Sequence, residues 1–94
     1  MTAPARVTLL TQAACAFCDQ AKDALVRLSS QFALDVEEID GASPDGLALA
    51  ASAGLAFPPG VFIDGNLFSH GRLSERKLRR HLERHGFALP DGET

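Results

Sequence analysis

The apolar positions of the first half of the chain form strand-like runs and one helix-like stripe. Residues 6–11 are a short apolar run rich in strand formers, so we expect a buried first strand there. From Cys15 to about Ser29, apolar residues recur three or four positions apart, which predicts a helix. In residues 34–40 apolar and acidic positions mix, which indicates a second strand with one polar face, near a sheet edge.

The middle of the chain predicts a second helix followed by a hairpin. Ser43 and Pro44 are typical of a helix start and Gly54 of a helix end, with an alanine-rich segment between them. We expect strands at 60–63 and 66–69, joined by the tight turn that an Asp-Gly pair favours.

A last helix is expected after Ser74. Leu73 precedes this cap and Leu78 follows it by four residues, which is the spacing of a hydrophobic staple. Gly86 should end the helix, and residues 87–94 read as a loose tail. The order β-α-β-α-β-β-α makes the first two strands parallel and the last two antiparallel. We therefore predict an α/β fold with a four-stranded mixed sheet flanked by helices.

Composition bounds the possibilities further. The 94 residues fit one domain, 46% of them are hydrophobic, and the net charge is −3. This balance argues against non-specific nucleic-acid binding. The longest apolar stretch, residues 47–57, is shorter than the ~20 residues that a membrane span needs. The chain also shows no charged leader followed by an apolar signal segment. We therefore expect a cytoplasmic protein.

The charge is unevenly distributed along the chain. Residues 1–71 carry a net charge of −5 and residues 72–94 a net charge of +2.

The two cysteines, Cys15 and Cys18, stand where the first strand has ended and the first helix begins. In that setting Cys15 caps the helix, and the N–H groups of the first turn lower the pKa of its thiol below that of a free cysteine. Cys18 lies one turn inward on the buried stripe. An outer attacking thiolate and an inner resolving thiol are what disulfide exchange requires.

A C-x-x-C pair also occurs in zinc sites, and His81 and His85 could complete a tetrahedral set. However, 62 residues separate Cys18 from His81, against about a dozen in a compact finger. We therefore predict no metal. A binding or adaptor module whose cysteines bind metal or are not catalytic stays open as the alternative.

Three segments carry a family pattern. They read VTLLTQAACAFC at 7–18, FPPGVFIDG at 57–65 and FSHGRLS at 68–74. With them the chain resembles the thioredoxin superfamily, and within it the glutaredoxins and the glutaredoxin-like redoxins that reduce ribonucleotide reductase. The resemblance covers about residues 6–85 and implies a thioredoxin-like fold.

The resemblance also implies a cis-proline, which an ungapped alignment places at Pro59, whereas an alignment shifted by one residue would make it Pro58. Substrate contacts are expected from Phe17, between the cysteines, and from these two prolines. His70 and Arg72, beside a glycine in a loop, are further candidates for the border of the active site.

Family members imply the activity as well: a monomeric dithiol–disulfide oxidoreductase and electron carrier in cell redox homeostasis. It would hold no bound cofactor and would reduce disulfide-containing proteins, without nucleic acid or membrane partners. Two departures bear on the electron source. Gln12 stands where a glutathione site usually has lysine, and Pro58 has no N–H to donate. We therefore expect a thioredoxin-reductase-type flavoenzyme to be a better donor than glutathione.

Overall fold

Seven elements follow one another in the predicted order in the computed structural model, which describes residues 3–90. They are β1 (Ala5–Thr11), α1 (Ala16–Leu28), β2 (Leu34–Asp40), α2 (Pro44–Ala53), β3 (Gly60–Ile63), β4 (Asn66–His70) and α3 (Glu75–Arg84). The predicted fold class is therefore confirmed. No helix within the described residues is long and apolar enough to cross a membrane.

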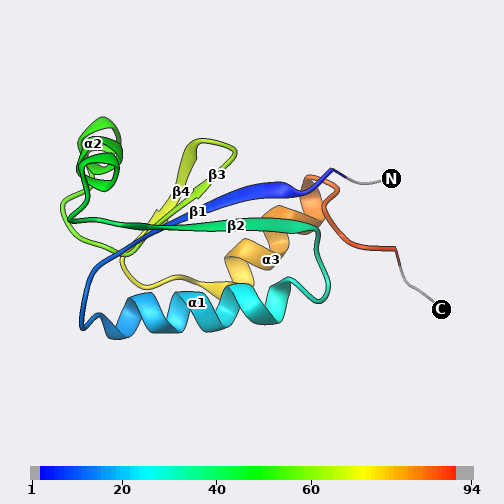
Figure 1. The fold of residues 1–94 in the computed structure, drawn as a ribbon. Helices are drawn as coiled ribbons and strands as arrows, with labels where there is room; N and C mark the ends of the chain where they lie inside the picture. The colour runs from blue at the N-terminus through cyan, green and yellow to red at the C-terminus, as the bar shows by residue number, and fades with distance from the viewer. Residues whose placement is uncertain (1–2, 91–94) are drawn as a thin grey trace.

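The four strands form one sheet in the order β2-β1-β3-β4. Strands β1 and β2 are parallel, as their connection through α1 predicts, whereas β3 runs antiparallel to both of its neighbours. Asp64 and Gly65 join β3 to β4 with φ angles of 50° and 86°, which fits a tight turn with positive φ at both central residues. Helices α1 and α3 cover one face of the sheet, and α2 lies at one end of the other face (Figure 1).

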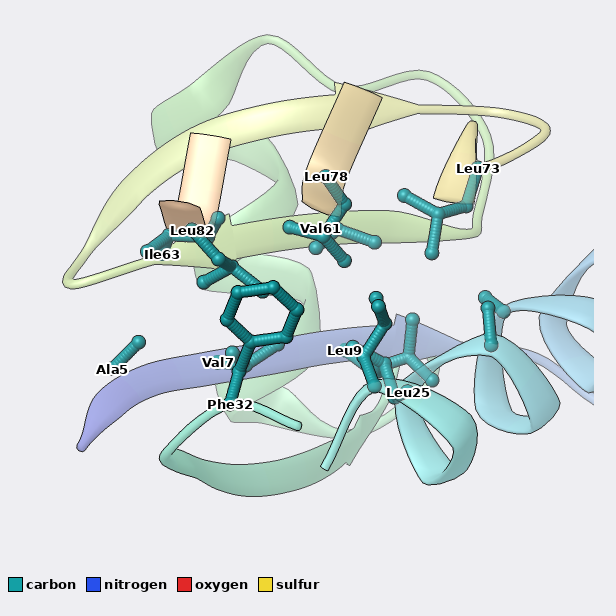
Figure 2. Close-up of a cluster of buried hydrophobic side chains, with 13 residues drawn as sticks. Ala5, Val7, Leu9, Leu25, Phe32, Val61, Ile63, Leu73, Leu78 and Leu82 are labelled. Atoms are coloured by element: carbon teal, nitrogen blue, oxygen red, sulfur yellow. The ribbon is translucent and has the colours of Figure 1, made fainter. Parts of the chain in front are cut away.

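The core lies between the sheet and the helices α1 and α3. Alternate residues of β1 point into it because successive side chains of a strand face opposite sides of the sheet. Figure 2 shows them meeting the leucines of α3 and the residues of α1. The buried cluster comprises Ala5, Val7, Leu9, Ala21, Ala24, Leu25, Leu28, Phe32, Val61, Ile63, Leu73, Leu78 and Leu82.

The predicted helix caps are present. The hydroxyl of Ser43 accepts a hydrogen bond from Gly46 N at 3.0 Å, and that of Ser74 accepts one from Lys77 N at 3.2 Å. Leu73 is buried before the start of α3, as the staple spacing predicts. These contacts fix where α2 and α3 begin, and so fix the loops that precede them.

The prediction of a loose tail over 87–94 is wrong at its beginning. Phe32 and Ala88 form an antiparallel bridge, and the Phe87 ring packs against the core. The physical reason is apolar burial: the chain turns at the end of α3 and returns an aromatic side chain to the core instead of leaving it in water. Residues 91–94 lie outside the described part of the chain.

Candidate functional site

A disulfide joins Cys15 and Cys18 at the start of α1, with 5.2 Å between their Cα atoms. Cys15 has extended backbone angles and occupies the N-cap position, and Cys18 lies in the first helical turn. This position follows from the sequence, because the apolar stripe of α1 begins at Cys18 and the strand β1 ends four residues before Cys15.

The two sulfurs have different surroundings. Cys18 is 1% exposed, whereas Cys15 is only partly buried. The backbone N–H of Cys18 donates a hydrogen bond to Cys15 Sγ at 3.1 Å. A donor at a helix N-terminus stabilises negative charge on the atom that accepts it, so this arrangement favours a thiolate at Cys15 after reduction.

The loop before β3 reaches the same end of the sheet as the disulfide. Gly60 pairs with Leu10 near the end of β1, so the loop that precedes Gly60 lies beside the β1–α1 turn (Figure 1). The peptide bond between Pro58 and Pro59 is cis, which confirms the assignment of the cis-proline to Pro59 rather than Pro58. Pro59 is buried and Pro58 is partly exposed.

The segment between β4 and α3 is also anchored at this end. The N–H of Gly71 donates to the carbonyl oxygen of Pro59 at 2.8 Å, and Gly71 has a φ of 75°, which glycine adopts without strain. His70 and Arg72, on either side of this glycine, are exposed. The structure thus brings both residues to the end of the sheet where the prolines and the disulfide lie.

Two phenylalanines at this end are unusually open to solvent. Phe17, between the cysteines, is 52% exposed, as a substrate contact requires. Phe57, which precedes the two prolines, is 76% exposed and was not among the candidates from sequence. The sequence feature that could have identified Phe57 is a large apolar residue next to two prolines. It lies outside any strand or helix pattern that would place it in the core.

The histidines of α3 lie apart from the cysteines. His81 and His85 have ring centroids 4.2 Å apart, and His81 also meets Phe68 edge-on. Within residues 3–90 no group of three or more His, Cys, Asp or Glu side chains is arranged to hold a metal ion. The tetrahedral set that the sequence left open is therefore not assembled.

Comparison with known sequences links the chain to mycobacterial proteins. It is 35% identical over 88 residues to uncharacterized protein Rv0508 of Mycobacterium tuberculosis, and equally to uncharacterized protein Mb0520 of Mycobacterium bovis. Each alignment covers 90% of this chain and 90% of the relative. No family model matches the chain.

Comparison with solved structures shows the fold. A thioredoxin-like protein from Clostridium perfringens superposes with a TM-score of 0.73 at 13% identity, over 97% of this chain and 79% of that one. A mutant thioredoxin from Halobacterium salinarum gives 0.69 at 21% identity, over 92% and 78%. Thioredoxin 1 from Thermosipho africanus gives 0.66 at 18% identity, over 85% and 92%. The chain therefore has the thioredoxin-like fold that its sequence predicts.

Proposed function

The chain belongs to the protein family that includes Rv0508 of Mycobacterium tuberculosis and has the thioredoxin fold, and from this premise we propose that it is a dithiol–disulfide oxidoreductase. A thioredoxin-like fold with a C-x-x-C pair supports a redox role in general. The more specific proposal is a glutaredoxin-like electron carrier that reduces disulfides in other proteins through Cys15 and Cys18.

The reaction begins from the reduced protein. The Cys15 thiolate attacks one sulfur of the substrate disulfide, which forms a mixed disulfide and releases the other substrate sulfur as a thiolate. The Cys18 thiolate then attacks Cys15 Sγ, which closes the Cys15–Cys18 disulfide and releases the second substrate sulfur. Two electrons pass to the substrate, whose two sulfurs take up protons from solvent. An external dithiol or flavoenzyme returns two electrons to the protein.

The hydrogen bond from Cys18 N to Cys15 Sγ is the observation that carries this proposal. It supports the proposed roles, because the partly exposed sulfur of Cys15 accepts this hydrogen bond, whereas Cys18 is buried. A substrate reaches Cys15 first. Cys18 then needs no access from solvent, since its target is the neighbouring residue.

The surface around the disulfide supplies the substrate contacts that we propose. Phe17 offers an exposed apolar ring and Pro58 a partly exposed one, whereas Pro59 is buried and is not itself open to a substrate in this state. His70 and Arg72 contribute polar groups from the neighbouring loop. An extended substrate segment would lie between the helix start and this loop.

We further propose that glutathione is a poor electron source. Gln12 is exposed and uncharged, so a carboxylate of glutathione would lack a charge-assisted contact of about 1.5–3 kcal/mol. Pro58 has no N–H, which removes one hydrogen bond of about 0.5–1.5 kcal/mol. Together these losses correspond to roughly 30- to 2,000-fold weaker binding if they add. Arg72 can recover part of the carboxylate attraction.

The test is a trapping experiment on the reduced protein with a disulfide peptide. The Cys18→Ser variant should accumulate a stable mixed disulfide with the peptide, since its resolving thiol is absent. The Cys15→Ser variant should form none and should not turn over. Faster alkylation of Cys18 than of Cys15 at neutral pH would overturn the assignment. Stoichiometric zinc on protein purified without chelator, with no turnover, would instead favour the binding or adaptor module.

A further inference from the structure

A groove runs between strand β4 and the exposed side of α3, and its lining is strongly basic. Four exposed cations border it: Arg72, Lys77, Arg80 and Arg84. The last three follow one another at spacings of three and four along α3, so they share one face of the helix. The buried leucines of α3 lie on another face, which leaves these cations directed to solvent and to the groove.

None of the four cations has a salt-bridge partner within residues 3–90. The acidic residue at the start of α3, Glu75, is already held by Arg27 of α1 at 2.8 Å. The hydroxyl oxygen of Ser69, which also lines the groove, is buried and has no hydrogen-bond partner in the described chain. The groove therefore combines uncompensated positive charge with an unused polar atom.

The basic character is local. The chain as a whole carries net −3, and residues 1–71 carry net −5. The pKa of His81, which lines the groove, is lowered first by burial and then by His85 and Arg84, while Asp64 acts in the opposite direction. The contribution of Arg84, which follows burial and His85 in size, comes from the positive charge gathered on this part of α3.

The groove starts at the candidate active site. Arg72 stands one residue after Gly71, whose N–H is bonded to Pro59 O at 2.8 Å. Figure 1 shows the chain passing from β4 into α3 at the end of the sheet where α1 begins. The end of the groove that holds His70 and Arg72 therefore lies at the end of the sheet where the disulfide lies.

We propose that this basic groove docks an acidic segment of the disulfide-containing protein that the chain reduces. The inference rests on the proposed function for the identity of the partner. The chemistry selects an acidic peptide chain: several carboxylates spaced along a backbone match cations spaced along a helix. The acidic remainder of the molecule repels a long polyanion such as nucleic acid, which would extend beyond the groove.

Complementary charge acts mainly on the rate of association and is screened by salt, so the proposal is tested with two peptides that differ only in charge. Both are dye-labelled and carry the same disulfide loop. In one peptide the loop is followed by about six glutamates, and in the other by the same number of glutamines. Binding to the oxidised protein is read by fluorescence anisotropy. Reduction of each peptide, with dithiothreitol as electron source, is read as kcat/KM.

The groove variant is Arg80→Gln/Arg84→Gln, and the matched control is Arg6→Gln/Lys22→Gln, which removes the same charge from the other elements. We expect the groove variant to bind the glutamate peptide at least about fivefold more weakly and to reduce it correspondingly more slowly, while its rate with the glutamine peptide is unchanged. The control variant should change the affinity for the glutamate peptide and kcat/KM for its reduction by less than about twofold each. High salt should remove the preference for the glutamate peptide.

The two readouts separate the docking proposal from the proposed function. If both peptides bind equally, or if the groove and control variants lose the same binding affinity, the docking proposal is wrong. If binding depends on charge but neither peptide is reduced, the docking proposal is supported and the proposed oxidoreductase function is wrong. Tighter binding of a single-stranded oligonucleotide of equal charge, lost in the groove variant, would identify a nucleic-acid site and overturn the acidic protein partner.

Discussion

The side-chain amide of Gln20 donates a hydrogen bond from Nε2 to the carbonyl oxygen of Leu73 at 3.1 Å, which ties α1 to the segment that precedes α3. The two residues are 53 positions apart in the chain. The bond holds the segment that carries Arg72 against the helix that carries the disulfide. The contact therefore helps to fix the position of the segment between β4 and α3.

A Gln20→Glu substitution tests this contact. It replaces the donating NH2 group with a carboxylate oxygen that faces Leu73 O, so two acceptors meet. We expect the free energy of unfolding of the oxidised protein to fall by about 1–3 kcal/mol at pH 7, the cost of a partly buried polar group without its partner. The loss should shrink at pH 4, where a protonated carboxyl group can donate again.

The matched control is Gln31→Glu, the same chemical change at an exposed position. The Oε1 atom of Gln31 accepts a hydrogen bond from Arg79, so a carboxylate there keeps an acceptor opposite a cation. Its free energy of unfolding should stay within about 0.5 kcal/mol of that of the unchanged protein. Equal destabilisation by both substitutions would show that the Gln20 contact has no special weight.

The role of Phe17 is tested by Phe17→Ser. A substrate contact that covers about 50 Å² of the ring is worth about 1.2 kcal/mol, so kcat/KM for a protein disulfide should fall roughly eightfold. The free energy of unfolding should fall by about 1–2 kcal/mol, because the side chain is 52% exposed and the rest of it is covered by the folded chain. Val26→Ser on the same helix, where the side chain is 71% exposed, is the control and should leave kcat/KM unchanged. An equal effect of the two substitutions would remove Phe17 from the site.

Much of the fold was predictable because its signals are short-range. The N-cap hydroxyls act on N–H groups three residues away, as Ser43 does with Gly46 and Ser74 with Lys77. The Asp64-Gly65 turn and the position of Cys15 at a helix start depend on adjacent residues in the same way.

What could not be predicted depends on distant partners. The bridge between Phe32 and Ala88 forms only after α3 has packed on the sheet, so no local pattern distinguishes it from a tail. The contact of Gln20 with Leu73 could likewise not be predicted, because the polar residues of α1 are those expected on a solvent-exposed helix face. The basic stripe of α3 was visible in the sequence, but the groove beside it required the position of β4.

The ion pair between Arg27 and Glu75 predicts a pH effect on stability. The Arg27 hydrogen bond lowers the pKa of Glu75 below the ordinary glutamate value, although partial burial opposes the shift. On lowering the pH, the unfolded chain therefore takes up a proton at this group before the folded chain does. The stabilisation is complete above the ordinary glutamate pKa and is lost as the pH falls through the lower folded value.

Denaturant unfolding of the unchanged protein and of Glu75→Gln, from pH 7 to pH 3, measures this. The free-energy difference between them should be present at pH 7, should close toward pH 3, and should narrow with added salt because the pair is exposed. A difference that stays constant over this range would mean that the charge of Glu75 does not contribute.

The last prediction concerns the electron source. Gln12 lies in the exposed turn between β1 and the disulfide, where a lysine would place a positive charge beside the site. With one disulfide substrate, turnover should be slower with glutathione and its reductase than with NADPH and thioredoxin reductase, because glutathione finds no cation at this position. A Gln12→Lys variant should gain glutathione-dependent activity by roughly tenfold or more, as expected for a charge-assisted contact of about 1.5–3 kcal/mol. Its rate with thioredoxin reductase should stay the same.

The matched control is Gln12→Met, of similar size and without charge, which should gain no glutathione-dependent activity. Faster turnover of the unchanged protein with glutathione would contradict the proposal, and an equal gain in the lysine and methionine variants would contradict its electrostatic cause.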